Sequence, residues 1–232
     1  MWVVKVGGSL ATAEVLPFWL DVLSCYGGGK VVVVPGGGPF AELVHESQAY
    51  WKFDDSSAHF MALLAMTQFG LMLSGMQPDL APVEHKEDIK HVLANAGVPI
   101  WLPTKMVTDD DSIEHSWDIT SDSLAAWLAI HLGASRLMLV KSVDIDSSLS
   151  IEDLARQDIV DAHFPDYVRQ GDFPVSVMSQ KEFDRIPQML AHDVSASVQV
   201  RHTKHSRTRA SASGDNCPVR FPALHSAPRK PR

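Results

Sequence analysis

Cysteines and long apolar runs are scarce in this chain, and each shortage narrows the class of protein to which it can belong. The two cysteines, Cys25 and Cys217, provide neither the framework of a disulfide-rich secreted domain nor the spacing of a zinc site. No run is expected to approach the apolar length needed to cross a bilayer, and the first residues resemble a strand, not a signal peptide. We therefore expect a cytoplasmic protein without membrane contact, in which both thiols are bystanders.

Common nucleotide and metal motifs are absent as well. The chain has no G-x-x-x-x-G-K-[ST], which excludes a P-loop, and no G-x-G-x-x-G, so a dinucleotide-binding fold is not indicated. The consecutive acids at 109–111 are typical of a solvated turn, because adjacent carboxylates do not converge on one ion. We expect no metal site built by the protein. Residues 103–118 are expected to form an exposed loop or short hairpin, with a mobile lid over the substrate as its functional interpretation.

Positive charge is scarce except at the end of the chain. The net charge is −8, but residues 201–232 contain eight Lys or Arg against the single acid Asp215, a balance of +7. The preceding 200 residues therefore carry −15, and an acidic body argues against a nucleic-acid surface on the folded part. Because the stretch Val198–Arg232 is rich in Ser, Arg, His and Pro and lacks hydrophobic periodicity, we expect a basic, disordered tail over residues 193–232.

Glycine is concentrated in two turns, each of which follows an apolar, strand-like run. Glycines at a strand end let backbone N–H groups approach an anion closely, and a helix that starts just beyond adds the positive end of its dipole. Two such turns predict two phosphate-sized groups held face to face; the alternative is that the glycines serve only tight strand-to-helix turns. The first turn, after residues 2–6, is Gly7, Gly8 and Ser9, and the second, after residues 31–34, is Gly36, Gly37 and Gly38.

A lysine lies inside the first of these strands. Lys5 is flanked by Val4 and Val6, and burying its charge there would be costly without a counter-charge. A phosphate bound at the strand end resolves that cost. Lys5 together with both turns therefore favours anion binding over a purely structural role for the glycines.

The hydrophobic pattern alternates between strands and helices along most of the chain. This alternation predicts an α/β fold with an open, mostly parallel β-sheet between two layers of helices, a three-layer αβα domain over residues 1–192. The helix at 56–74 is apolar nearly all round, which predicts deep burial or a subunit interface. The expected strands are 2–6, 31–34, 98–102, 136–140 and 174–178, and the expected helices are 11–25, 39–51, 56–74, 85–96, 121–132, 151–170 and 181–191.

An acidic residue lies at the start of the helix expected at 121–132. Thr120 or Ser121 is a suitable N-cap, and Asp122 falls in the first turn, where a carboxylate suits the helix dipole. Asp122 is then either part of a helix start and nothing more, or a carboxylate that holds phosphate-binding lysines in place.

A further charged pair follows the strand expected at 136–140. Lys141 and Asp144 lie at its carboxyl end, and ligands bind at that edge in open α/β sheets. Both residues are therefore candidates for contact with the ligand.

These four segments, in this order, resemble the amino acid kinase family, and in outline the resemblance covers residues 1–180. It implies an acceptor-binding first part and a nucleotide-binding part from about residue 117. By this resemblance Lys5 contacts the transferred phosphoryl group, and Asp122 organises the catalytic lysines. The resemblance further implies that nucleotide phosphates are held by Gly7, Gly8 and Ser9, that the nucleotide pocket is reached through Lys141 and Asp144, and that the acceptor is held by Gly36, Gly37 and Gly38.

Three stretches are similar to one branch of that family, the small archaeal and methylotroph kinases of the methanofuran pathway, which phosphorylate (aminomethyl)furanylmethyl phosphate. They are residues 58–66, 98–103 and 116–123. The chain departs from the family in one respect: no Gly-Gly-x-x-x-Lys loop supplies a second catalytic lysine late in the sequence. Lys141 is a candidate substitute, and beyond Asp144 the remaining candidates are Lys181 and the lysines of the tail.

The resemblance implies an ATP-dependent kinase that moves the γ-phosphoryl group to a phosphate or carboxylate acceptor, with Mg²⁺ held through the phosphates. Trp117 or Trp101 is a candidate to stack on a flat acceptor ring, with a place in the core as the alternative; we assign Trp117 to the acceptor site. A homo-oligomer is expected. Two alternatives stay open: a kinase for another phosphorylated acceptor, such as a nucleoside monophosphate or isopentenyl phosphate, and a non-catalytic nucleotide- or oxyanion-binding protein of the same fold.

Overall fold

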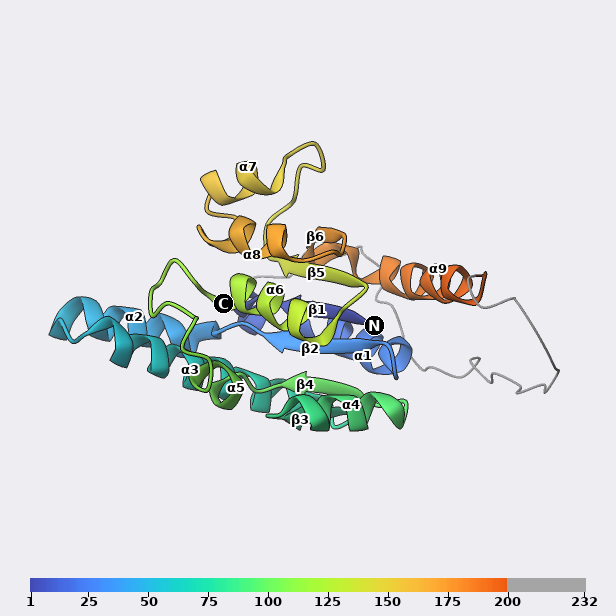
Figure 1. Ribbon diagram of the computed structural model, residues 1–232, viewed down its shortest axis with the longest axis horizontal. Helices are drawn as coiled ribbons and strands as arrows, with labels where there is room; N and C mark the ends of the chain where they lie inside the picture. The colour runs from blue at the N-terminus through green and yellow to red at the C-terminus, as the bar shows by residue number, and fades with distance from the viewer. Residues whose placement is uncertain (200–232) are drawn as a thin grey trace, which may run out of the picture.

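A parallel β-sheet forms the centre of the protein, as the computed structural model shows for residues 1–199, with side chains described to residue 192. Within this part the sheet has six strands in the order β3-β4-β2-β1-β5-β6, and every pairing is parallel. This arrangement confirms the predicted fold class (Figure 1). The strands are β1 (Trp2–Val6), β2 (Val31–Pro35), β3 (Leu80–Val83), β4 (Val98–Trp101), β5 (Arg136–Lys141) and β6 (Val175–Ser179).

Helices cover both faces of the sheet, because alternate strand residues point to opposite sides. Val4 and Val6 pack in one apolar cluster with α1 and the start of α9, whereas Val3 packs in a second cluster with α6 and α8. Lys5 has the parity of Val3 and therefore points to the α6 side. The helices are α1 (Leu16–Gly27), α2 (Gly38–Trp51), α3 (Asp55–Met76), α4 (Lys86–Ala94), α5 (Thr104–Thr108), α6 (Ser121–Leu132), α7 (Ile151–Arg156), α8 (Phe164–Gln170) and α9 (Ile186–Gln199), with the short 3₁₀ helices η1 (Gly8–Thr12) and η2 (Gln180–Arg185).

The structure corrects several predicted elements. The strand β3 was not predicted, because it is short and contains Pro82, which is tolerated at a sheet edge such as this one. The helix expected at 151–170 is instead two helices, α7 and α8, separated by a bend in which Asp158 adopts a φ of 54°. The loop expected at 103–118 contains the helix α5, and the helix expected from residue 11 starts only at Leu16, after η1.

Helix α3 is long and apolar enough to cross a membrane, judged by length and composition alone. The expectation that no segment meets those two criteria is therefore wrong, although a core helix of a soluble protein also meets them. In the described chain α3 runs beside α2 (Figure 1) and contacts β2, β3 and β4, with Leu63, Phe69 and Leu73 buried. Phe60 and Leu64 remain 46% and 38% exposed. Of the two alternatives predicted for this helix, deep burial holds for only part of its surface, and a subunit interface stays a prediction.

Helix α9 continues to Gln199 and so crosses the boundary expected between residues 192 and 193. The remaining part of the predicted tail, residues 200–232, lies outside the described residues. Cys217 and the tail lysines fall in this part.

Candidate active site

The two glycine turns lie side by side at the carboxyl ends of β1 and β2. The N–H of Gly36 donates to the carbonyl of Val6 over 2.9 Å. A Cβ on Gly8 would lie 2.4 Å from the backbone nitrogen of Gly38, and a Cβ on Gly36 would lie 2.3 Å from that of Gly8. Neither position tolerates a side chain without backbone movement, so the close contact of the two turns requires glycine.

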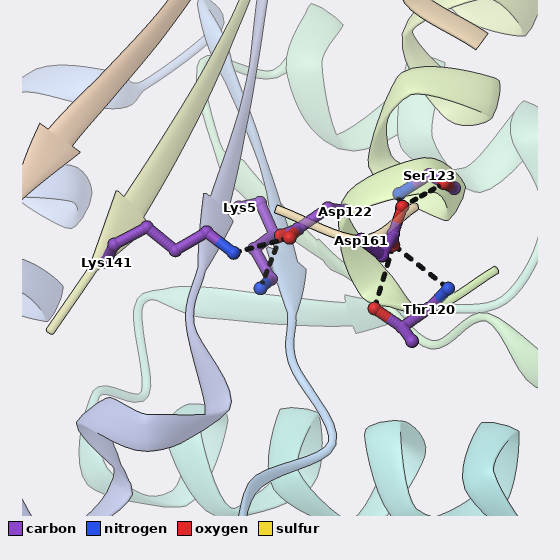
Figure 2. Close-up of polar contacts among 6 residues, drawn as sticks. All are labelled: Lys5, Thr120, Asp122, Ser123, Lys141 and Asp161. Atoms are coloured by element: carbon purple, nitrogen blue, oxygen red, sulfur yellow. Dashed lines mark hydrogen bonds and ion pairs between the residues drawn. The ribbon is translucent and has the colours of Figure 1, made fainter. Parts of the chain in front are cut away.

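One carboxylate joins two lysines directly above these turns. Asp122, in the first turn of α6, contacts the Nζ of Lys5 on β1 through Oδ1 at 2.7 Å and the Nζ of Lys141 at the end of β5 through Oδ2. Figure 2 shows both ammonium groups converging on this carboxylate. The sequence placed each of these residues at an element end, and neighbouring parallel strands bring those ends together: Lys5 pairs with Leu139 of β5 in the sheet register. We call Lys5, Asp122 and Lys141 the triad.

Two members of the triad are buried, Lys141 is partly buried, and together the three carry one excess positive charge. Lys5 and Asp122 are 4% and 3% exposed. Burial would raise the pKa of Asp122, but the charges of Lys5 and then Lys141 outweigh it, so the pKa lies below its usual value. Burial, and then the ammonium of Lys5, lower the pKa of Lys141 from 10.5 to about 8, although Asp122 opposes this change. Two cations against one anion leave a positive site that suits a phosphoryl group.

A second aspartate, which sequence reasoning missed, fixes the start of α6. Asp161, between α7 and α8, accepts hydrogen bonds from the N–H of Thr120 at 3.0 Å, from its hydroxyl at 2.8 Å and from the N–H of Ser123 at 3.0 Å, and it also accepts from the Ser123 hydroxyl (Figure 2). Thr120 is the N-cap residue as predicted, but its hydroxyl donates to Asp161 and caps no backbone N–H of α6. No local pattern reveals Asp161, because it lies about forty residues away in the sequence.

Two pockets open beside the triad. The larger, the triad pocket, has a volume of about 400 Å³. The smaller, the α3 pocket, measures about 60 Å³ and includes Gly37 of the second turn and His59 of α3. Trp117 and Thr120 line both, so the two pockets are neighbours. The triad pocket is lined by the three triad residues, by Gly7, Gly8 and Ser9 of the first turn, and by Asp118, Asp158 and Asp161 among others.

Of the predicted site residues, Asp144 lies outside the triad pocket and Trp117 lies at its edge. Asp144 does not line the triad pocket; its carboxylate pairs with Lys181 at 2.8 Å and accepts from the Ser179 hydroxyl at 3.0 Å. Trp117 lies between the pockets, with its indole N–H donating to the side-chain oxygen of Gln48 at 2.6 Å. Trp101 is fully buried and stacks on Trp127, so it belongs to the core and cannot face a ligand.

One of the three consecutive aspartates at 109–111, Asp110, is hydrogen-bonded to the rest of the structure. Asp110 accepts from the indole N–H of Trp127 at 3.0 Å and from the Ser112 hydroxyl at 2.6 Å. No group of three or more potential metal ligands occurs among the described residues. Asp110 thus anchors the loop against α6.

Comparison with known proteins identifies the family. Residues 1–145 match the family model described as the amino acid kinase family. The chain belongs to the amino acid kinase family. This assignment confirms the predicted family and its phosphotransferase class.

Relatives of known sequence and structure agree with this membership. The [5-(aminomethyl)furan-3-yl]methyl phosphate kinase of Methanocaldococcus jannaschii is 27% identical over 203 residues, which cover 82% of this chain and 93% of that relative. The uridylate kinase of Archaeoglobus fulgidus superimposes with a TM-score of 0.61 at 17% identity, covering 80% of this chain and 95% of that structure. The UMP kinase of Ureaplasma parvum gives a TM-score of 0.57 at 17% identity, covering 77% and 88%. At these identities the two solved structures show the shared fold.

Proposed function

We propose that this protein is an ATP-dependent kinase that transfers the γ-phosphoryl group of ATP to the phosphate of (aminomethyl)furanylmethyl phosphate. The observation that carries the proposal is the triad, in which two lysines and one buried carboxylate stand where two glycine turns meet. Phosphoryl transfer needs position and positive charge more than covalent chemistry, and the triad and the turns supply both.

The donor binds in the triad pocket in this proposal. The backbone of Gly7, Gly8 and Ser9 holds the phosphates of ATP, and Lys5 and Lys141 stabilise the charge that builds on the transferred group. The nucleoside occupies a second pocket of about 470 Å³, lined by Leu154 and Val177 among others. The walls of the two pockets are linked by a hydrogen bond: the N–H of Ile159, which lines the triad pocket, donates to the carbonyl of Leu154 at 2.9 Å.

Lys141 takes the place of the family's late lysine. It shares Asp122 with Lys5, which is the arrangement that a second catalytic lysine needs. The side chain of Lys181 is 66% exposed and pairs with Asp144 outside the lining of the triad pocket, which makes Lys181 the weaker candidate. The presence of two lysines at one carboxylate supports a catalytic protein over a non-catalytic anion binder.

Magnesium fits this site as an ion carried by the nucleotide. The triad pocket has the exposed carboxylates Asp118 and Asp158 on its wall, and Mg²⁺ typically keeps several waters while bound to one or two carboxylates and substrate phosphates. When bound, it would neutralise charge on the phosphates of ATP. Asp118 and Asp158 would then hold its water shell.

The acceptor phosphate lies against Gly36, Gly37 and Gly38, at the amino end of α2. Its oxygen attacks the γ-phosphorus, the bond from that phosphorus to the β,γ-bridging oxygen breaks, and ADP leaves with the bond electrons. Because the attacking phosphate oxygen is already anionic, no proton has to be removed. The products are ADP and the diphosphate of the acceptor.

A panel of acceptors tests the proposal. Release of ADP is followed with (aminomethyl)furanylmethyl phosphate, UMP, isopentenyl phosphate and no acceptor, and ³¹P NMR identifies the product. We expect a diphosphate from the first acceptor, and a loss of about a hundredfold or more in kcat for Lys5→Met, as for other electrostatic groups at reacting centres. ATP binding without turnover on any acceptor would favour the non-catalytic alternative.

We also propose a cytoplasmic homo-oligomer. ATP as donor fits the cytoplasm, and apolar side chains remain exposed on the helix pair α2 and α3. Such a patch is typical of an interface. Light scattering after gel filtration tests this proposal: a monomer at micromolar concentration contradicts it. The exposed side chains are Leu43, Tyr50, Trp51, Phe60, Met61, Leu64, Leu71 and Met76.

A further inference from the structure

The α3 pocket contains a buried imidazole nitrogen that no described residue satisfies. His59 is only 8% exposed and lines this pocket. Its Nε2 is buried and has no hydrogen-bond partner within the described part of the chain. A buried polar atom without a partner is costly in a folded protein, and such atoms recur where a ligand completes them.

The ring of His59 is held in place by its neighbours. It stacks on the ring of His115 with 4.7 Å between centroids and 13° between planes. His115 is fixed in turn by a 3.0 Å hydrogen bond between its Nδ1 and the Ser56 hydroxyl. Burial, and then the neighbouring His115, lower the pKa of His59 to about 4, so the imidazole is neutral at physiological pH. A neutral imidazole nitrogen can accept a hydrogen bond from a cationic donor.

The pocket also has a carboxylate, and no lysine or arginine is among the residues that line it. Asp55, at the start of α3, accepts from the side-chain amide of Gln48 at 2.8 Å. The other side of that amide accepts from the indole of Trp117 at 2.6 Å. Gln48 therefore positions both a negative charge and an aromatic ring at the pocket. This charge favours a cationic group over an anionic one.

The size of the pocket sets an upper limit on the group that enters it. A volume of about 60 Å³ gives room for roughly four to six water-sized groups. A furan-sized ring with a short substituent fits this space, whereas a nucleoside does not. Gly37 lines the same pocket, so a group bound there lies next to the turn that we assign to the acceptor phosphate.

We propose that the α3 pocket selects acceptors that carry a protonated amine, with His59 Nε2 accepting a hydrogen bond from the ammonium group. Asp55 balances the ammonium charge and Trp117 covers the attached ring. The inference rests on the proposed function, because it assigns the end of the acceptor that does not react. His59 and Asp55 are then the residues that determine specificity for this acceptor.

The test compares two acceptors on the full-length protein: (aminomethyl)furanylmethyl phosphate and its analogue with methyl in place of aminomethyl. In His59→Phe the ring stack persists but Nε2 is lost. We expect KM for the amine acceptor to rise about tenfold or more, the scale of losing one buried hydrogen bond to a charged group. The kcat for that acceptor and the KM for the methyl analogue should stay within about twofold to threefold, since neither depends on that bond.

Two further variants sharpen the comparison. His59→Gln retains a hydrogen-bond acceptor and should recover part of the preference for the amine. Glu46→Gln removes an exposed carboxylate from α2 outside the pocket and should change neither KM. Asp55→Asn should raise KM for the amine acceptor alone.

A binding measurement separates this inference from the proposed function. The Nε2 resonance of His59 is followed by ¹⁵N NMR, and Kd is measured calorimetrically, with each acceptor in the absence of ATP. A shift and tighter binding with the amine acceptor alone, combined with no turnover once ATP is added, would support the inference and overturn the proposed function. Turnover of both acceptors with equal KM, unchanged in His59→Phe, would overturn the inference alone. An absence of both binding and turnover would overturn both.

Discussion

The surroundings of Lys141 disfavour the protonated, charged form of its side chain. Burial and the neighbouring Lys5 lower its pKa to about 8, while Asp122 limits the shift. Lys141 needs its proton to stabilise negative charge, and it therefore loses that proton near pH 8, a pH that common assay buffers cover. The sequence placed Lys141 at the strand end, but only the structure shows that it shares a carboxylate with Lys5.

We therefore predict that kcat/KM falls as pH rises through about 8, where Lys141 loses its proton. Stability should move in the opposite direction. The unfolded chain keeps this proton up to about 10.5 and the folded chain up to about 8, so the free energy of unfolding rises with pH between these values. Kinetic pH profiles and urea unfolding measure the two trends.

Matched variants assign this effect to Lys141. Lys141→Arg stays charged at alkaline pH, so whatever activity it retains should not decline near pH 8. Lys181 does not line the triad pocket, so Lys181→Met should leave the pH profile unchanged. An alkaline decline that persists in Lys141→Arg would contradict the assignment.

The second prediction at this scale concerns Asp122. Asp122→Asn leaves two buried ammonium groups without their counter-charge, so we expect the free energy of unfolding to fall by about 3–5 kcal/mol, as when one partner of a buried ion pair is removed. The double variant Asp122→Asn with Lys141→Met removes one of the repelling cations and should recover part of that loss. Chemical denaturation of the wild type, both single variants and the double variant measures the coupling. Losses that simply add would show that Asp122 and Lys141 do not interact.

Helix α6 shows how far local sequence signals reach at the scale of elements. Its bounds were predicted correctly, because Thr120 marks its start and Gly133, with a φ of 61°, marks its end. The carboxylate that binds the backbone N–H groups at the start of α6 was not predicted, because Asp161 lies far away in the sequence, in the connection between β5 and β6. Strand β3 and the break between α7 and α8 were missed because Pro82 obscures the strand pattern and the helical pattern continues through Asp158.

We predict that Asp161→Ala lowers both stability and turnover. Each hydrogen bond from the start of α6 to this charged carboxylate contributes up to about 3 kcal/mol to the free energy of unfolding. Because the bonds share one acceptor group, removing them together costs less than the sum of the single contributions. Because Asp122 lies in the turn that Asp161 holds, kcat should fall while the KM values change little.

The matched control for Asp161→Ala is a variant that removes a helix cap away from the triad pocket. Asp153 forms a capping box with Ser150 at the start of α7 and does not line the triad pocket. Asp153→Ala should reduce stability by about 1 kcal/mol, which is typical of a helix cap, and should leave kcat unchanged. Equal kcat values in the two variants would contradict a positioning role for Asp161.

At the scale of the whole molecule, the parallel sheet explains why the sequence could predict which residues lie together at one edge, but not which residues line the neighbouring α3 pocket. Lys5, Asp122, Lys141 and the two glycine turns all lie where an element begins or ends, and a parallel sheet gathers such ends at one edge. His59, in contrast, lies within an apolar helix pattern. Its role depends on the pocket that α3 forms with the segment before α6, which no local pattern reveals.

The contact between the two turns gives a prediction for the whole site. Gly8→Ala adds a Cβ that would lie 2.4 Å from the nitrogen of Gly38, so both turns have to move. We expect KM to rise for ATP and for the acceptor together, and kcat to fall about tenfold or more, because small misplacements of reacting groups have large effects. Initial-rate kinetics with both substrates varied measures this.

Gly75 offers the control for that substitution. A Cβ there meets no atom within 4 Å, and Gly75 lies within α3. Gly75→Ala should preserve both KM values and stabilise the protein by up to about 1 kcal/mol through helix propensity. A change in only one KM in Gly8→Ala would show that the two turns act independently.

The excess positive charge of the triad has a practical consequence for the resting enzyme. Without substrates, two ammonium groups share one carboxylate in the pocket that the first glycine turn also lines. Sulfate and inorganic phosphate present the same tetrahedral oxygens as the terminal phosphate of a nucleotide. Such salts should therefore compete with ATP and protect the fold against heat, whereas chloride at equal ionic strength should do so far less. Purification and assay buffers for this enzyme then act as weak inhibitors, and its measured affinity for ATP depends on which salt is chosen.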